Sequence, residues 1–494
     1  MTKPTHPANR APASSSAPWA LRIGEGLWSS MARHVNRGDH DEHGGALICG
    51  VAQRPDGPVL LAREFVPAID GVDYVPGTAG FRALTPAFLR RVTKRARREK
   101  WVVLLVHGHG KSGRSVAFSR TDLNSHESGY GALLDIAGGL PVGALVITDH
   151  AVAGDIWQPD GNRAPLAKTT VLGTNVVTML PTAADPPRGL LGDDRQARLF
   201  GLTGRAILAR TRIVVVGAGG AGSLVVELLA RLGVGEIVLI DDDRVAIHNL
   251  PRLIGVRRLD AHAWLTDRPW TSLPSPVRRW LSQHTRHKTS IAARAARRAN
   301  RDVHIEQHRR DVSEPDAATA LTTADWIVLA ADTATARLVV NKVAHQYLIP
   351  ATQVGVKVDT NEAGAVGTVH AVSRPIAPEA GCLDCQGLID HGALAIESLP
   401  ETLRHTADYG TGDPAPAVAA LNALAVAQAV SELMMALTGL SEQAAVVHHR
   451  VLARRGKWAR VAPRRDAACS TCSTTPTSVL ARGDGRPIAG VRLH

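Results

Sequence analysis

A strand, a glycine-rich turn and a helix near the middle of the chain constrain its fold more than any other feature. Residues 212–216 read RIVVV, and the GAGGAG that follows places glycines in the spacing G-x-G-x-x-G. A helix predicted over 221–232 and a strand predicted over 236–240 complete a β-α-β unit, which opens a parallel sheet. The apolar run at 325–330 is expected to form a later strand of the same sheet. The sequence therefore predicts an α/β domain with a mainly parallel sheet.

The glycines of this turn suit it to holding a nucleotide. Gly217 permits a tight turn, Gly219 lets backbone N–H groups approach phosphates at the helix N-terminus, and Gly222 allows close packing of helix on strand. Asp241 lies about twenty residues further on, where a ribose-binding carboxylate belongs. Together with Gly220, these are candidate cofactor-binding residues. By itself this pattern favours an NAD-dependent oxidoreductase.

The residues that follow favour a different use of the nucleotide. Residues 239–252 read LIDDDRVAIHNLPR, which fits the pattern D-x-D-x-V-x-x-x-N-L-x-R. This long pattern resembles that of the E1/ThiF/MoeB activating enzymes, which have a Rossmann-like domain and use ATP to adenylate a carboxylate. The resemblance implies that Asp241 and Asp243 belong to the nucleotide site. It also implies that Asn249 and Arg252 face the phosphates, where a guanidinium is a planar donor for anionic oxygens.

Further positions agree with this family. Lys288 matches the lysine that contacts ATP phosphate, and Asp332 matches the aspartate that binds Mg²⁺. Arg195 matches an arginine that reaches a neighbouring subunit's ATP site in related homodimers, so we expect a homodimer. The resemblance covers roughly Asp194–Thr474. This chain departs from it at Leu253, usually glutamine, and at Thr333, usually asparagine.

Cysteine placement separates structural from catalytic roles. The chain has five cysteines, and four of them form two C-x-x-C pairs, Cys382/Cys385 and Cys469/Cys472. These pairs match the structural zinc site of the family, where four thiolates leave no open coordination position. No cysteine lies between Cys385 and Cys469, the interval in which thioester-forming members place their nucleophile. We therefore expect adenylation without a thioester on this chain, with the thiol supplied by an E2-like or other acceptor protein.

The N-terminal half carries a second pattern, H-x-H followed by S-x-x-D. His107, His109 and Asp122 offer three ligands to one Zn²⁺ and leave a fourth place for water. The pattern resembles the JAB/MPN family in its JAMM metalloprotease form, although Gly110 replaces the usual proline. The resemblance implies an α/β fold, Ser119 as the oxyanion stabiliser and a glutamate as the base. Glu42 is the first candidate for that base and Glu64 the second.

The length of 494 residues is consistent with several domains. We expect a disordered arm at 1–18, the JAB/MPN-like domain at 19–181, a linker at 182–193, the ThiF/E1-like domain at 194–476 and a loose tail at 477–494. An insertion at 257–287 carries Trp264, Trp270 and Trp280, and forms a lid, a partner surface or ordinary packing.

Amino-acid composition and charge indicate the class of protein and its expected location. Apolar residues make up 45% and charged residues 21% of the chain, as in soluble globular proteins. We recognise no membrane span and no secretory signal, and so expect a cytoplasmic protein. The net charge of +12 is attributed to solvated helix faces, because no nucleic-acid-binding motif accompanies it.

Taken together, the sequence predicts an enzyme that uses ATP, Mg²⁺ and Zn²⁺. The second half is expected to adenylate the C-terminal carboxylate of a ubiquitin-like protein with a Gly-terminated tail. The first half is expected to process or deconjugate that protein, in a bacterial ubiquitin-like modification pathway. Three alternatives stay open: activation of a sulfur-carrier protein for cofactor synthesis, an NAD-dependent oxidoreductase and a non-catalytic scaffold.

Overall fold

The computed structural model describes most of the chain, which divides into two compact units. The first consists mainly of Ser29–Thr169 and the second mainly of Ala184–His494. Apart from Pro18 and Thr182, the predicted arm and linker lie outside the described residues. The described residues are 18–76, 80, 82–110, 113–182, 195–262, 274–277, 280, 284–360, 365–377, 381–399, 418–442 and 447–491.

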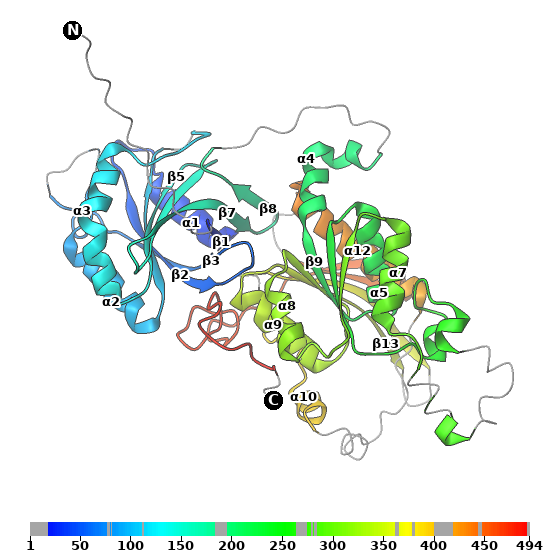
Figure 1. The fold of residues 1–494 in the computed structure, drawn as a ribbon. Coiled ribbons are helices and arrows are strands. Elements are labelled where there is room, and N and C mark those ends of the chain that lie inside the picture. The colour runs from blue at the N-terminus through cyan, green and yellow to red at the C-terminus, as the bar shows by residue number, and fades with distance from the viewer. Residues whose placement is uncertain are drawn as a thin grey trace, which may run out of the picture. The chain divides into compact units, whose positions relative to one another are not determined.

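The first unit is built on a mixed sheet in the order β1-β3-β2-β4-β5-β6-β7-β8, with a further pairing between β1 and β7. β4 pairs parallel with β5 and antiparallel with β2, and α2 and α3 lie side by side on the sheet (Figure 1). The elements are β1 (Trp19–Gly24), α1 (Glu25–Val35), β2 (Gly44–Ala52), β3 (Val59–Pro67), α2 (Pro86–Glu99), β4 (Val102–Gly108), α3 (Arg120–Ala137), β5 (Val142–Ile147), β6 (Val152–Trp157), β7 (Arg163–Leu172) and β8 (Val176–Met179).

Helix α2 shows how local sequence sets these elements. Thr85 caps its N-terminus by accepting a hydrogen bond from the Phe88 amide at 3.2 Å, and Pro86 occupies the first turn. Phe88, Val92 and Ala96 recur at helical spacing and are buried against Ile48 and Val103 of the sheet. The local sequence thus accounts for both the start and the buried face of this helix.

The second unit contains a sheet in the order β11-β10-β9-β12-β13-β14-β15-β16. Strands β11 to β13 run parallel and β13 to β16 antiparallel. Helices α5, α7 and α12 lie on one face, and α8 and α9 on the other (Figure 1). The predicted strands over 212–216 and 236–240 are confirmed, and β12 joins them in the same sheet.

The elements of this unit are α4 (Ala197–Arg210), β9 (Arg212–Val216), α5 (Gly220–Leu232), β10 (Glu236–Ile240), α7 (Lys288–Ala299), β11 (His304–His308), α8 (Pro315–Thr322), β12 (Trp326–Leu329), α9 (Ala334–Gln346), β13 (Ala351–Thr360), β14 (Val366–Ile376), α10 (His391–Glu397), α12 (Ala419–Thr438), β15 (His448–Leu452) and β16 (Lys457–Val461).

Helix α12 is long and apolar enough to cross a membrane by length and composition alone. In the structure its residues Val426, Val430 and Leu433 are buried in the main core, together with Val225 and Leu229 of α5. Packing within this unit therefore accounts for its apolar composition.

The prediction of a loose tail is wrong for residues 478–483, which are packed against the rest of this unit. Ser478 and Ala481 are fully buried, and the Ala481 amide donates to the His345 carbonyl at 2.9 Å. The Gln346 side chain donates to the carbonyls of Gly483 at 2.7 Å and Arg486 at 2.6 Å. The partners come from the end of α9, so the composition of the tail could not reveal them.

Part of the 257–287 insertion is described. Asp260 is buried and accepts two hydrogen bonds from the Arg294 guanidinium, which ties residues 257–261 to α7. Trp280 is 57% exposed and stacks on His284. Trp264 and Trp270 lie outside the described residues, so the role of the insertion stays open.

The packed tail predicts a stability effect. Replacing Leu480, which is 4% exposed, by alanine should lower the free energy of unfolding of the second unit by about 3 kcal/mol, because it leaves a cavity. Leu259→Ala is the matched control, since Leu259 is 67% exposed. Denaturant unfolding of the full chain measures both, and equal stability of the two variants would show that the tail contributes no packing.

Candidate functional site

The carboxyl ends of β9, β10 and β12 meet at one edge of the second sheet. Val216, the last residue of β9, is level with Ile240 of β10 and with Leu329 of β12. The loops that follow these strands carry the predicted glycines, the acidic motif and Asp332. Open parallel sheets bind ligands outside their carboxyl ends, so this edge is the candidate nucleotide site.

Two positions of the turn require glycine, because other backbone atoms lie where a Cβ would be. Gly217 has φ +91°, and a Cβ on it would lie 2.8 Å from the Ala331 nitrogen. A Cβ on Gly222 would lie 1.8 Å from the Gly217 carbonyl oxygen. At Gly219 a Cβ would meet nothing within 4 Å, so the space in front of the α5 N-terminus is open on this side. The tight turn and the open space together allow an anion to approach the backbone amides at the N-terminus of α5.

Asp241 holds the two loops together. Its carboxylate accepts hydrogen bonds from the Ala218 amide at 2.6 Å and from the Asp243 amide at 2.9 Å. Burial raises the pKa of this carboxyl to about 6. Lys288 forms an ion pair with Asp243, which places its ammonium at the same edge. The predicted grouping of these three residues is thus present in the structure.

The remaining residues of the long motif have distinct positions. A Cβ on Gly220 would lie 3.2 Å from Cγ of Arg252, so the arginine lies against the glycine turn. Asn249 is buried, and its side-chain oxygen accepts a hydrogen bond from the Ala246 amide at 2.8 Å. In this structure Asn249 shapes the loop. Arg195 is exposed, and its predicted reach into a neighbouring subunit stays a prediction.

Asp332 is exposed in the loop between β12 and α9. Thr333, noted above as a departure from the family pattern, caps α9 by accepting from the Ala336 amide at 3.2 Å. The Glu397 carboxylate accepts from the Ala334 and Thr335 amides at 2.9 and 2.8 Å. Sequence reasoning missed Glu397, because no spacing signal connects α10 with the start of α9.

The two C-x-x-C pairs converge into one cluster. The Sγ atoms are 3.7 Å apart between Cys382 and Cys385, 3.6 Å between Cys382 and Cys469, and 3.5 Å between Cys385 and Cys472. Four sulfurs at about 2.3 Å from a tetrahedral zinc ion lie about 3.8 Å apart, so the cluster fits that metal. Backbone amides of Asp466 and Thr471 also point at two of the sulfurs.

The fifth cysteine lies apart from this cluster. Cys49 is fully buried in β2, and burial raises the pKa of its thiol. It packs there as a small apolar residue.

The first unit brings His107, His109 and Asp122 together. Nε2 of His107 is 3.2 Å from Nε2 of His109, and the two nitrogens are 3.4 and 3.5 Å from the Asp122 carboxylate oxygens. His107 lies near the end of β4, and His109 follows directly after that strand. Asp122 lies in the first turn of α3. One divalent ion can accept all three ligands, because their ligand atoms lie within 4.8 Å of one another.

Ser119 is the N-cap of α3. Its hydroxyl accepts from the Asp122 amide at 3.1 Å, while its own amide donates to the Asp122 carboxylate at 2.7 Å. This reciprocal capping box fixes the orientation of the aspartate. Ser119 therefore supports Asp122 in the structure, and its predicted oxyanion role stays a prediction.

Glu42, and not Glu64, lies beside the histidines. Glu42 shares a pocket with His107 and Asp122, and burial raises the pKa of its carboxyl. Glu64 instead forms a two-pronged ion pair with Arg95, at 2.9 and 2.6 Å. The structure thus favours the first of the two predicted glutamates.

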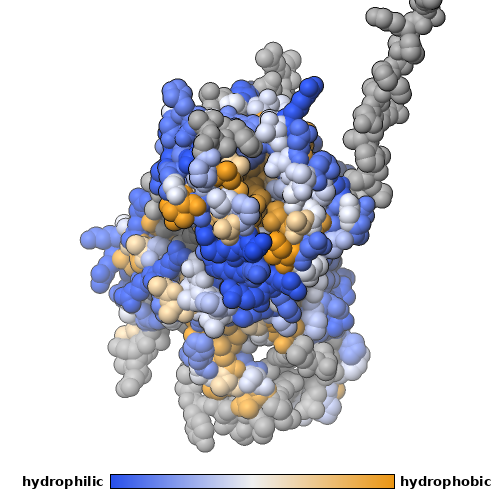
Figure 2. All heavy atoms as spheres, turned by 90° about the vertical axis from the view of Figure 1, so that its left-hand side faces the viewer, coloured by the Kyte–Doolittle hydropathy of each residue, from blue (hydrophilic) through white to orange (hydrophobic). Residues whose placement is uncertain are grey.

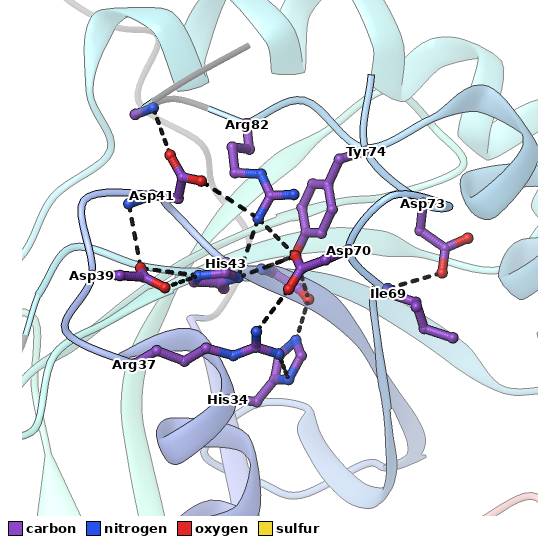
Figure 3. Close-up of polar contacts among 12 residues, drawn as sticks. His34, Arg37, Asp39, Asp41, His43, Ile69, Asp70, Asp73, Tyr74 and Arg82 are labelled. Atoms are coloured by element: carbon purple, nitrogen blue, oxygen red, sulfur yellow. Dashed lines mark hydrogen bonds and ion pairs between the residues drawn. The ribbon is translucent and has the colours of Figure 1, made fainter. Parts of the chain in front are cut away.

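A polar network beside Glu42 was not predicted (Figure 3). His43 bonds the Asp39 carboxylate at 2.9 Å, and the Arg82 guanidinium bonds Asp70 at 2.7 Å and stacks over the Tyr74 ring. Tyr74 and Arg82 line the same pocket as Glu42. Viewed from the side of α2 and α3, the molecule has a hollow bordered by apolar groups, with hydrophilic groups beside it (Figure 2).

The second half of the chain also matches a known family by sequence. The profile of the ThiF family covers residues 193–471. The chain belongs to the ThiF family.

Individual ThiF-family relatives are similar over shorter stretches. The chain is 30% identical over 185 residues to the SAMP-activating enzyme E1 of Haloferax volcanii, which covers 37% of this chain and 56% of that one. It is 51% identical over 53 residues to the adenylyltransferase and sulfurtransferase UBA4 of Yarrowia lipolytica, covering 11% and 13%. The chain thus spans between 13% and 56% of the length of these two relatives.

A solved structure is also similar. Escherichia coli MccB with ATP aligns over 57% of this chain and 75% of that one, with 20% identity and a TM-score of 0.42. The family assignment rests on the sequence profile.

The sulfur cluster gives a prediction that metal analysis can check. Cys472→Ser should lower the zinc content of the purified full chain by about one ion and lower its melting temperature, because a structural site needs all four thiolates. Cys49→Ser is the control, since it makes the same chemical change away from the cluster. An unchanged zinc content in Cys472→Ser would rule out a zinc site there.

Proposed function

We propose that the second unit adenylates the C-terminal carboxylate of a ubiquitin-like protein with a Gly-terminated tail, using ATP. The observation that carries this proposal is the convergence of the glycine turn, Asp241, Lys288 and Arg252 at one sheet edge in a ThiF-family chain. The names of two relatives agree, since one is a SAMP-activating enzyme and the other an adenylyltransferase.

In the proposed reaction a carboxylate oxygen of the substrate attacks the α-phosphorus of ATP. The bond from that phosphorus to the pyrophosphate oxygen breaks, which yields an acyl adenylate and pyrophosphate. Asp241 receives the ribose hydroxyls, while Lys288 and Arg252 offset phosphate charge at the turn. Lys288 then exchanges its ion pair with Asp243 for a phosphate oxygen.

Mg²⁺ fits this site through Asp332, whose exposed carboxylate ends the loop after β12. The ion supplies neutralisation of the pyrophosphate charge. Arg195 completes the site from a second copy of the chain, which makes the active form a homodimer.

The acyl group then passes from the adenylate to a thiol on another protein, which forms a thioester and releases AMP. The interval between Cys385 and Cys469 contains no cysteine, so this chain offers no nucleophile at the usual position. A separate thiol-bearing protein, E2-like or another acceptor, supplies that thiol. The pathway that we propose first is protein modification in a bacterial cytoplasm. The alternative pathway is activation of a sulfur carrier for cofactor synthesis. The family assignment leaves the NAD-dependent alternative without support.

The first unit is proposed to be a JAMM-type zinc peptidase that acts on the same substrate. Its JAB/MPN assignment rests on the sequence pattern and on the grouping of His107, His109 and Asp122 with Glu42. His107, His109 and Asp122 would hold Zn²⁺, which when bound would lower the pKa of a water molecule. Glu42 would accept a proton from that water, and burial, which raises the pKa of its carboxyl, suits it to this role. Trimming exposes the carboxylate that the second unit activates.

The adenylation proposal is tested by ATP–pyrophosphate exchange in the presence of purified ubiquitin-like proteins ending in Gly-Gly. Asp332→Ala should lower the exchange rate at least about 100-fold, because the pyrophosphate charge is no longer neutralised. Asp316→Ala, an exposed aspartate on α8, is the control and should exchange normally. Equal exchange rates in the two variants would contradict the assignment of Asp332 as a Mg²⁺ ligand.

The peptidase proposal is tested by two glutamate variants and a ubiquitin-like fusion substrate. Glu42→Gln should abolish cleavage while zinc content stays constant, because Glu42 moves a proton and binds no metal. Glu64→Gln should cleave normally, since its carboxylate is paired with Arg95. His107→Ala should lose both cleavage and about one zinc ion per chain. Cleavage by Glu42→Gln at the original rate would refute the assigned base.

A further inference from the structure

One face of the antiparallel half of the second sheet is unusually basic. Arg450 of β15 lies opposite Val372 of β14, so it shares a face with Arg374 and His370, which are two residues to either side of Val372. By the same alternation His448 points to this face. Arg374 lies opposite Gln353 of β13, which in turn is level with Leu329 at the end of β12. The basic face therefore begins beside the nucleotide edge.

Within the described part of the chain, these arginines lack acidic partners. Among the residues that the structure describes, no carboxylate forms an ion pair with Arg374, Arg450 or Arg337 of α9. Arg374 bonds the neutral Gln353 side chain at 3.3 Å, and Arg337 bonds the Leu388 carbonyl at 3.3 Å. Asp359, a carboxylate that acts electrostatically on His370, is paired with Lys357 at 3.0 Å.

Several buried nitrogens on or beside this face also lack hydrogen-bond partners within the described residues. Within the described part of the chain, Nε of Arg337 and of Arg450 and one ring nitrogen each of His370 and His448 are buried without a hydrogen-bond partner. Burial, with repulsion from Arg450 and Arg337, lowers the pKa of the Arg374 guanidinium to about 10. Half-buried like charges that repel one another cost folding free energy. A bound anion removes that cost.

The opposite face of the same strands has none of this character. Ala371 and Val451 are buried against Ala425 of α12, and Glu432 of α12 bonds Ser373 and His449. Charge on that face is thus compensated within the chain. The contrast indicates that the basic face is arranged for a ligand from outside it.

We infer that Arg374 and Arg450, with Arg337 beside them, bind the carboxylate of an aspartate or glutamate in the C-terminal tail of the protein substrate. Two carboxylate oxygens match the forked donors of arginine. This inference rests on the proposed adenylation, which requires the substrate tail to reach the nucleotide edge. It adds to that proposal the requirement that the C-terminal tail of the substrate contains an aspartate or glutamate.

The geometry of the sheet sets where in the tail that acid belongs. Neighbouring strands lie about 4.8 Å apart, so β14 and β15 are roughly 10 and 14 Å from β12. An extended peptide covers about 3.4 Å per residue. The acidic residue is therefore expected about three to five positions before the C-terminal glycine.

The test uses the full chain and fluorescein-labelled octapeptides that end in Gly-Gly. One series carries a single glutamate at successive positions in an alanine background, and its twin carries glutamine. Fluorescence anisotropy should show about tenfold tighter binding of glutamate over glutamine at one of the three positions named above. Arg374→Gln and Arg450→Gln should each erase that difference.

Arg460→Gln is the matched control, because Arg460 is exposed on β16 and pairs with His449 on the opposite face. It should keep the full difference. Melting temperatures should be unchanged or higher in Arg374→Gln and Arg450→Gln, since repulsion is relieved; a residue that only holds the fold would lower them.

Several results would overturn the inference. Glutamate and glutamine peptides could bind alike, or neither could bind. The two variants could instead weaken binding of ATP or pyrophosphate, which would assign the arginines to the nucleotide. ATP binding by the unmodified chain is measured in the same preparation. Its absence would defeat the adenylation proposal, whereas intact ATP binding without glutamate discrimination defeats the tail site alone.

Discussion

The second unit depends on the close approach of α5 to the end of β9. Gly222 allows its helix to lie against the Gly217 carbonyl, and Gly217 allows the turn to pass the backbone at Ala331. A side chain at either position would push the helix N-terminus away from the sheet edge. Because β10 and β12 end level with β9, that edge also receives Asp241 and the loop of Asp332. The backbone amides, the acids and Lys288 meet only if this contact is kept.

The two halves of the second sheet are expected to have different roles. The parallel half ends at the nucleotide edge, where the helix N-terminus and basic side chains favour phosphate. The antiparallel half has one face covered by α12 and another that carries Arg374 and Arg450, which have no acidic partner among the described residues. Such uncompensated charge is unfavourable for folding alone, and its retention beside a nucleotide edge points to recognition of an anionic substrate.

Both metal-binding groups are closed by contacts between distant segments. The sulfur cluster joins Cys382 and Cys385 to Cys469 and Cys472, and so attaches the C-terminal segment to the sheet. The histidine pair at the end of β4 is completed by α3, whose capping box orients Asp122. In the first unit His43, which follows Glu42 just before β2, contacts Arg82 within a polar network (Figure 3).

The sequence by itself determined the β-α-β unit, the long acidic motif and the family, because these depend on short-range spacing of glycines, apolar runs and charges. It also predicted two candidate metal-binding groups, whose members the structure brings together, but left Glu42 and Glu64 open. The tertiary structure places Glu42 in a pocket with His107 and pairs Glu64 with Arg95. It also packed the tail on α9 and set Arg374 beside Arg450. Those contacts join residues far apart in the chain, and single-sequence patterns do not record which distant strands or helices become neighbours.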